Sequence, residues 1–353
     1  MNKLFREMSS NLRARIIAIY GVLILFNVAA WLWAVLAFRH HPVLLGTAFL
    51  AYSFGLRHAV DADHIAAIDN VTRKLMQEGK RPVAVGFMFS LGHSTIVVIG
   101  SVLIASSTLM LQGRLASFRN IGGIVGTAVS MLFLFGIAFI NLGVFRSVYK
   151  AFVQVHNGAP YVEEDMGTLL AGGGFFARLL RPVFGMIQQS WHMYPLGLLF
   201  GLGFDTATEI GLLSISAAEV AKGLPLSSAL IFPALFAAGM SLIDTTDNIL
   251  MIGAYGWAFV KPVRKLYYNM TITLVSVVVA LVVGGIEGAG LLADQFQLRG
   301  NFWDVARKLN ENLGKLGYCI IALFVLSWIF SAVFYRWLRF DEIGDSKSGT
   351  AAG

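Results

Sequence analysis

The segment Arg57-His58-Ala59-Val60-Asp61-Ala62-Asp63-His64-Ile65 gathers two imidazoles, two carboxylates and a guanidinium within an apolar stretch that begins at Val43. A charged side chain near the centre of a bilayer costs roughly 2.5–3.5 kcal/mol on insertion scales. Charged groups inside a membrane span therefore mark sites that bind ions or perform chemistry. Because imidazole and carboxylate are ligands for divalent transition metals, the segment predicts an intramembrane cation site.

Three other apolar runs also contain polar groups, at residues 90–95, 203–209 and 241–248. With a helical rise of about 1.5 Å per residue, His58 and the polar groups of these runs fall near the midplane of their spans. Separate helices that place polar groups at one depth are expected to share one ion site. The candidate metal-binding residues are His58, Asp61, Asp63, His64, His93, Asp205, Glu209, Asp244 and Asp247.

The spacing within the first of these segments is not suited to a straight helix. At about 100° per residue, Asp61 and His64 share one face, while His58 lies about 120° from His64 and Asp63 lies off both faces. We therefore predict that the helix is kinked or unwound around residues 59–63. Such a departure is tolerated at membrane depth where the backbone lines a cavity enclosed by protein.

The elements that carry these residues are predicted to be membrane helices. The chain of 353 residues is 57% hydrophobic and 13% charged, whereas soluble domains average about 25% charged residues. Apolar runs of the roughly 20 residues needed to span a bilayer predict an all-α polytopic protein of about eight transmembrane helices. The predicted spans are 16–38, 43–69, 83–107, 121–146, 191–217, 228–253, 270–293 and 316–338. They form one domain over residues 1–340, followed by a flexible cytoplasmic tail at 341–353.

The basic residues indicate the orientation of these spans. Eighteen Lys and Arg residues fall on the side of the two termini and eight on the opposite side. By the positive-inside rule, both termini face the cytoplasm and the protein resides in the cytoplasmic membrane. The segment 147–190 is then a cytoplasmic loop, and the amphipathic segment 296–315 lies on the outer side. The net charge of +7 follows from this topology and indicates no nucleic-acid partner.

A similarity between two parts of the sequence favours an internal repeat. Phe54-Gly55-Leu56 recurs as Phe200-Gly201-Leu202, at an offset of 146 residues. The pattern Ser-Leu-x-His-Ser-Thr at 90–95 recurs as Ser-Leu-x-Asp-Thr-Thr at 241–246, at an offset of 151. Spans 2–3 then correspond to spans 5–6, and an offset of three spans inverts the topology, as in many secondary transporters.

Two sequence observations narrow the chemistry. Cys319 is the single cysteine, so an intrachain disulfide and a multi-thiolate metal site are excluded and the ligands must be nitrogen and oxygen. The sequence has no G-x-x-x-x-G-K-[ST] motif, so it has no ATPase domain of the P-loop type. The energy for any transport must come from a gradient or from a partner.

Four motifs, in this order, resemble those of the nickel/cobalt transporters of the NiCoT family. They are RHAVDADHI at 57–65, LGHSTIVV at 91–98, LGFDTATEI at 202–210 and GMSLIDTTDN at 239–248. The resemblance implies a high-affinity permease that imports Ni(II), Co(II) or both as its substrate, across the lipid bilayer and without a further cofactor.

The resemblance also implies roles for the candidate residues. His58, Asp63 and His64 would form the core of metal recognition, and His93 with the acids of spans five and six would act as outer ligands, relay groups or proton carriers. The residue types agree, since neutral imidazole suits Ni and Co and the Irving–Williams order favours Ni over Mn and Fe.

Two other classes of membrane protein remain as alternatives. An intramembrane metal-dependent hydrolase would hold Zn with His and Asp from several helices and activate water. A proton or alkali-cation antiporter would use the acids but has no need of two histidines that flank an aspartate. The number of acids disfavours a single hydrolytic site, so we expect a transporter that is not an enzyme.

Overall fold

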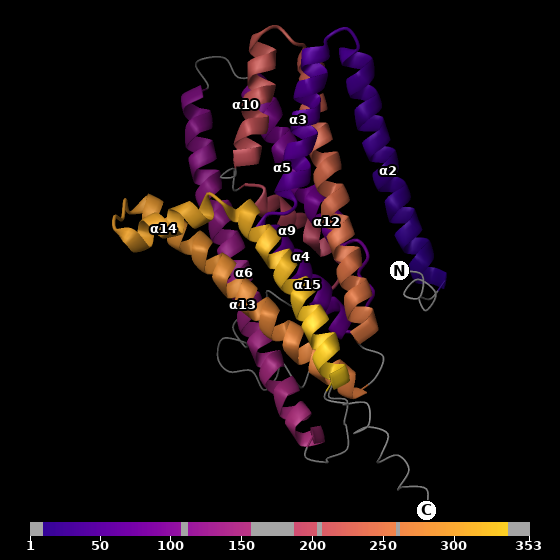
Figure 1. The fold of residues 1–353 in the computed structure, drawn as a ribbon. Coiled ribbons are helices and arrows are strands. Elements are labelled where there is room, and N and C mark those ends of the chain that lie inside the picture. Colours follow the sequence, from indigo (N-terminus) through magenta and orange to yellow (C-terminus); the bar gives the residue numbers. More distant parts are fainter. Residues whose placement is uncertain (1–9, 107–111, 157–186, 203–206, 259–261, 338–353) are drawn as a thin grey trace, which may run out of the picture.

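The computed structural model describes residues 10–106, 112–156, 187–202, 207–258 and 262–337, and these ranges form helices joined by turns (Figure 1). The helices of the first half are α2 (Ser10–Phe38), α3 (Pro42–His58), α4 (Ala62–Gln77), α5 (Val85–Ser106) and α6 (Gln112–His156). Those of the second half are η1 (Ser190–His192), α9 (Met193–Phe200), α10 (Ala207–Ala221), α11 (Leu226–Ala229), α12 (Ile231–Ala258), α13 (Pro262–Gln295), α14 (Asn301–Asn310) and α15 (Leu313–Trp337).

The prediction of an all-α protein with several membrane spans is confirmed, but the count of eight is not reached. Among the described residues, five helices are long and apolar enough to cross a membrane, and up to seven spans result if each of two bent helix pairs counts as one. The predicted fifth span, 191–217, is divided between η1, α9 and α10. Residues 203–206, between α9 and α10, are not among the residues that the structure describes. Strongly exposed apolar residues such as Ile17, Leu25 and Val43 suit contact with lipid.

The predicted break in the second span is confirmed. α3 ends at His58, α4 begins at Ala62, and the two helices are bent by 51°. Two tight turns close the end of α3, with Val60 N–H donating to Arg57 O (3.1 Å) and Asp61 N–H donating to His58 O (2.9 Å). Asp61 then adopts an extended conformation (φ −65°, ψ 147°), which redirects the chain into α4.

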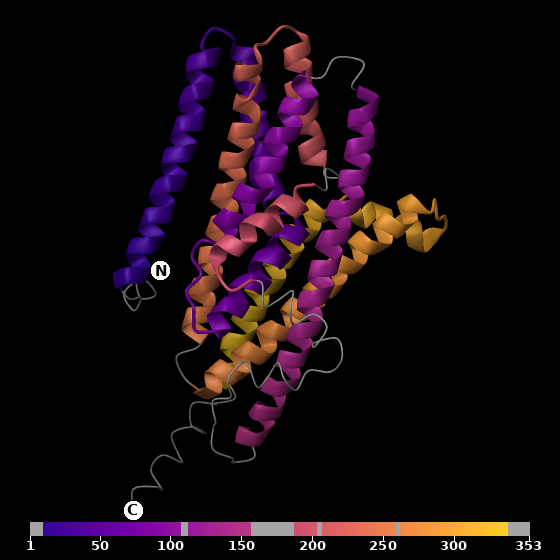
Figure 2. The same cartoon turned by 180° about the vertical axis from the view of Figure 1, so that it is seen from behind.

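The buried apolar residues form two cores, one on each side of this break. The first core packs α4 against parts of α5, α6, α9, α13 and α15, with Ile65, Ile68 and Leu75 as members from α4. The second core packs α2 and α3 against α10 and the first half of α12, with Phe232 and Phe236 at its centre. In Figure 2, α6 runs along most of the length of the molecule, and the short helix α9 lies beside it.

Glycines allow the central helices to touch backbone to backbone. A Cβ atom on Gly55 of α3 would lie 2.1 Å from the carbonyl oxygen of Phe236 on α12. A Cβ atom on Gly86 of α5 would lie 2.0 Å from the carbonyl oxygen of Asp244, also on α12. Small residues at helix contacts are the usual way in which membrane helices approach closely. These contacts bring the polar groups of α3, α5 and α12 together.

Several helix boundaries differ from those predicted, and two of the differences lengthen a helix at its C-terminal end. α6 continues to His156, ten residues beyond the predicted end of the fourth span, because no glycine or proline interrupts the sequence between residues 144 and 157. α4 continues to Gln77, so Arg73, which follows the predicted end of the second span at residue 69, lies in the helix and is almost fully buried.

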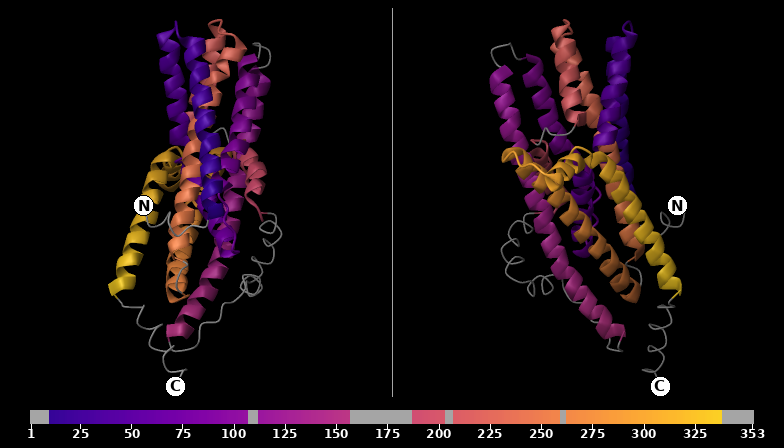
Figure 3. Two further views of the ribbon diagram at one scale, coloured as in Figure 1. Left: turned by 90° about the vertical axis from the view of Figure 1, so that its right-hand side faces the viewer. Right: turned by 60° about the vertical axis from the view of Figure 1, so that its left-hand side comes forward.

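The amphipathic segment predicted at 296–315 contains a helix. α14 occupies residues 301–310 and joins α15 at a bend of 77°. Phe302 and Val305 are exposed on α14, while Arg307 bonds to Asp294 and Asp304. Figure 3 shows α14 at the upper ends of α13 and α15, where it joins them. The side of the membrane on which α14 lies stays a prediction.

Candidate metal centre

Three buried histidines meet at the break in the second span. His58 is the last residue of α3, His64 lies in the first turn of α4, and His93 lies near the middle of α5. One ring nitrogen from each lies within 4.8 Å of the other two, which is a spacing that could hold a metal ion. The side chains are 1%, 0% and 3% exposed, respectively. The break makes this cluster possible, because a straight helix would separate His58 from His64 by about 120°.

Two of these imidazoles contact an aspartate through Nδ1. His58 Nδ1 lies 3.0 Å from Oδ2 of Asp61, and His64 Nδ1 lies 3.3 Å from Oδ2 of Asp244 on α12. An Nδ1–H that donates to a carboxylate fixes the ring orientation and leaves the Nε2 lone pair available to an ion. Nε2 of His64 is buried and has no hydrogen-bond partner within the described ranges, as expected for a nitrogen held ready for a ligand.

The third imidazole contacts a glutamate through the other ring nitrogen. His93 Nε2 lies 2.7 Å from Oε1 of Glu209, which is in the first turn of α10, and 3.0 Å from Nε2 of His58. The distance from His58 Nε2 to the same Glu209 oxygen is 3.7 Å. These three atoms form a compact N,N,O set.

The separation of the two imidazole nitrogens in this set is compatible with metal ligands. Nitrogen ligands lie about 2.0–2.1 Å from a divalent transition metal, so two of them at a right angle lie about 2.9 Å apart. The observed separation of 3.0 Å between Nε2 of His58 and Nε2 of His93 is close to this value. Right-angled nitrogen and oxygen ligands are typical of square-planar and octahedral ions, whereas a tetrahedral ion would need a wider spacing.

The other candidate residues lie around this triad or outside the described ranges. Asp63, in the first turn of α4, is partly buried and interacts electrostatically with all three imidazoles, and its Oδ1 has no hydrogen-bond partner within the described part of the chain. Asp247 on α12 lies within electrostatic range of Asp69 and Asp244 but does not join the triad. Asp205 lies outside the described residues.

Thr208 is a site residue that we did not single out from the sequence. Its hydroxyl oxygen lies 3.3 Å from Nδ1 of His58, and it precedes Glu209 in the first turn of α10. Its place within the motif at 202–210 was the available signal. Contacts with Asp61 and Thr208 together hold the His58 ring from two different elements.

A second buried polar cluster lies further along α4. Asp69 accepts hydrogen bonds from the hydroxyls of Tyr255 and Ser276 and lies within electrostatic range of Arg73. Arg73 in turn donates to Thr273 on α13 (2.8 Å) and to Asn70 (3.0 Å). Asp69 and Arg73 are four residues apart, so the sequence alone could have placed them on one face of a helix. The cluster ties α4 to α12 and α13.

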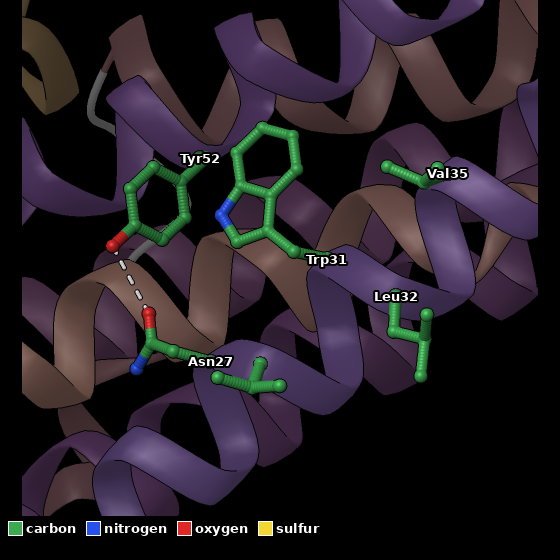
Figure 4. A pocket seen from close by; sticks show the side chains of 6 residues that line it. Asn27, Trp31, Leu32, Val35 and Tyr52 are labelled. Atoms are coloured by element: carbon green, nitrogen blue, oxygen red, sulfur yellow. Dashed lines mark hydrogen bonds between the residues drawn. The ribbon is translucent and has the colours of Figure 1, made fainter.

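The structure also has an open groove between α2 and α3, which differs in character from the triad. Its lining residues are Asn27, Val28, Trp31, Leu32, Val35 and Tyr52. Tyr52 donates a hydrogen bond to Oδ1 of Asn27 (3.0 Å), and the remaining side chains are apolar (Figure 4). Since its lining contains no acid and no histidine, the groove lacks the ligands of a cation site.

Comparisons with known proteins identify a family of metal transporters. The model of a family described as NicO, high-affinity nickel-transport protein, matches residues 44–334. A protein of Cupriavidus necator named high-affinity nickel transport protein is 61% identical over 94% of this chain and 94% of its own length. The hydrogenase nickel incorporation protein HupN of Bradyrhizobium diazoefficiens is 52% identical over 90% of this chain and 83% of its own length.

A relative that is named for cobalt transport is also similar. The cobalt transport protein NhlF of Rhodococcus rhodochrous is 38% identical over 91% of this chain and 92% of its own length. No solved structure matches the chain significantly.

Proposed function

This chain belongs to the NicO family of high-affinity nickel-transport proteins, and on that premise we propose that it imports Ni(II), Co(II) or both through the histidine triad at the break in its second span. The observation that carries this proposal is the meeting of His58, His64 and His93, each in contact with a carboxylate, inside a membrane-spanning bundle. Neutral imidazole nitrogens with nearby carboxylates suit these two ions, and the names of the relatives support them as substrates.

Capture of the ion would replace bound water by protein ligands. His58 Nε2, His64 Nε2 and His93 Nε2 supply the nitrogen lone pairs, and Glu209 supplies an oxygen beside two of them. A ligand nitrogen must be deprotonated to bind a metal, so capture requires that Nε2 of His93, which contacts Glu209, carry no proton. Asp63 offsets the remaining positive charge near the three rings.

A gradient is sufficient to drive such an import. Moving one elementary charge across 100 mV is worth roughly 2.3 kcal/mol, so a divalent ion gains about 4.6 kcal/mol on reaching a negative interior. This favours accumulation by more than a thousandfold. The charge of the ion and the inward direction of its movement are therefore consistent with a secondary-type permease in the cytoplasmic membrane that has no ATPase domain.

We further propose that α9 and α10 together form one broken span, which completes eight spans with both termini in the cytoplasm. Asp63 in the first turn of α4 and Glu209 in the first turn of α10 are 146 residues apart, which is the offset found between residues 54–56 and 200–202. Paired broken helices at corresponding positions are typical of inverted repeats in transporters. Reporter fusions at each terminus and within 157–186 and 296–300 test this topology, with an outward signal expected from the last segment alone.

The location of the triad supports alternating access. His58 belongs to the helix that packs in the second core, and His64 belongs to the helix that packs in the first. A relative rotation of the two cores about residues 59–61 would separate these ligands and release the ion to one side. The transported ion would thus be held only while both cores contribute their ligands.

The test of the proposed function is metal accumulation in cells that lack their own nickel and cobalt uptake systems. Cells that express this chain are expected to accumulate Ni, Co or both at submicromolar supply, as measured by elemental mass spectrometry and compared with cells that carry an empty vector. Absence of both metals from cells that contain the protein in their membrane would contradict the proposal. Proton or alkali-cation exchange, or hydrolytic activity dependent on Zn, would then be measured as the alternatives.

Asp63→Asn is expected to weaken capture more than folding. The change removes one negative charge beside three imidazoles but leaves a side chain of the same size, and the hydrogen bonds of the triad do not involve Asp63. We expect the KM for Ni(II) uptake to rise by about 10–100-fold, as for loss of an outer partner of a metal site, at an unchanged protein level. Asp304→Asn, at an exposed acid of α14, is the matched control. Undiminished uptake by Asp63→Asn at submicromolar metal would contradict the assignment.

A further inference from the structure

The start of α15 lies directly against the break in the second span. Gly314 and Gly317 are three residues apart on one face of α15, and both are buried. A Cβ atom on Gly317 would lie 1.5 Å from the carbonyl oxygen of Val60, and a Cβ atom on Gly314 would lie 2.6 Å from Oδ1 of Asp61. The backbone of α15 therefore touches both residues at the turning point of the chain, with no room for a side chain between them.

Asp61 is the residue that links this contact to the triad. It occupies the position that precedes α4, where an aspartate commonly caps the helix, yet its side chain makes no capping hydrogen bond. One carboxylate oxygen contacts Nδ1 of His58 (3.0 Å), and the other lies against Gly314 in the first turn of α15. Unpaired N–H groups and the helix dipole make a first turn favourable for a carboxylate. Asp61 is thus held between α15 and His58.

We propose that Gly314 is a positioning residue for ion binding, an inference that rests on the proposed function. Because Gly314 has no side chain, α15 can pack directly against the Asp61 carboxylate. The carboxylate held in this position orients the His58 ring so that Nε2 faces the ion. A methyl group at residue 314 displaces the carboxylate, frees the His58 ring and weakens the ion site. α15, which carries no metal ligand of its own among the described residues, thereby contributes to metal affinity.

The direct test compares Gly314→Ala with Gly285→Ala. Gly285 lies in another long apolar helix, α13, and a Cβ atom there would meet nothing within 4 Å. We expect Gly314→Ala to raise the Kd of the purified protein for Ni(II), and the KM for Ni(II) uptake, by about tenfold, the lower end of the range for outer partners of a metal site. The maximal uptake per protein molecule should be retained, and Gly285→Ala should match the native chain in all three quantities.

A double-mutant cycle with Asp61→Ala separates positioning from a general packing effect. Without the carboxylate, the nearest remaining neighbour of a Cβ atom at residue 314 is Nε of Arg57, at an ordinary 3.7 Å. Gly314→Ala should therefore cause no further loss of Ni(II) affinity in the Asp61→Ala protein, because residues that act as one unit are not additive. Additive losses, or a native Kd in Gly314→Ala, would overturn the inference.

Two outcomes need separate interpretation. If Gly314→Ala does not accumulate in the membrane, the double variant with Asp61→Ala should restore its level and match the Kd of Asp61→Ala alone, and failure to restore it overturns the inference. If the native chain takes up neither Ni nor Co, the proposed function fails. Uptake by the native chain together with an unchanged Kd in Gly314→Ala overturns the role of Gly314 alone.

Discussion

Replacement of His64 by alanine is expected to lower Ni(II) and Co(II) uptake at submicromolar supply by at least about 100-fold. His64 is fully buried, and its Nε2 atom is one of three nitrogens that meet at the break. Loss of an outer partner alone typically reduces metal affinity by 10–100-fold, and loss of a direct ligand should exceed this. The measurement is cellular Ni and Co content by elemental mass spectrometry, at equal amounts of protein in the membrane.

Two further variants identify the cause of the loss. His64→Asn retains an N–H group that can donate to Asp244 but lacks the Nε2 lone pair, so we expect it to be as inactive as His64→Ala. His40→Ala removes an exposed histidine outside the triad and should leave uptake unchanged. Uptake by His64→Asn near the native level would show that the contact with Asp244, and not the ligand nitrogen, is what His64 provides.

Replacement of Arg73 by methionine is expected to reduce the free energy of unfolding by about 1.5–3 kcal/mol, the usual contribution of a hydrogen bond made by a charged group. Arg73 is 1% exposed and Asp69 is 0% exposed. The change would leave the Asp69 carboxylate buried without its cationic neighbour and would remove the donor that reaches Thr273 on α13. Denaturant unfolding of the purified protein in detergent measures the effect.

The double variant Arg73→Met, Asp69→Asn tests this explanation. It carries no unpaired buried charge at this position, so it should be more stable than Arg73→Met alone. Arg39→Met, at an exposed arginine after α2, serves as the control and should unfold like the native chain. If Arg73→Met is as stable as this control, the Asp69–Arg73 cluster does not hold α4 in place.

Much of the candidate metal centre could be predicted from the sequence because helical geometry is regular within one element. The 3.6-residue period makes His58 and His64 incompatible with one straight helix, and the structure has a break between them. The common depth of His58, His93 and Asp244 likewise indicated a shared site, and the structure brings His93 beside His58 and Asp244 beside His64. Burial of polar groups in apolar runs is costly, so their positions carry information.

Contacts between distant helices could not be predicted in the same way. The period of a helix defines its faces but not the neighbours of each face, so the approach of Gly314 to Asp61 and the donation from Arg73 to Thr273 had no local signal. Arg73 was assigned to a loop because the apolar run of the second span was taken to end at residue 69. The place of His93 beside His58 also depends on Gly86 and similar glycines, whose close contacts appear only once the helices are packed.

The burial of α4 bears on how the protein can be assembled during synthesis. Thirteen of its 16 residues are buried, including two charged side chains, so α4 has no face suited to lipid. The helices that cover it include α12, α13 and α15, which leave the ribosome much later than α4 itself. The nascent chain must therefore keep α4 sheltered, beside the insertion machinery or in the headgroup region, until the last helix arrives. Premature termination before α15 would leave this polar helix only partly covered.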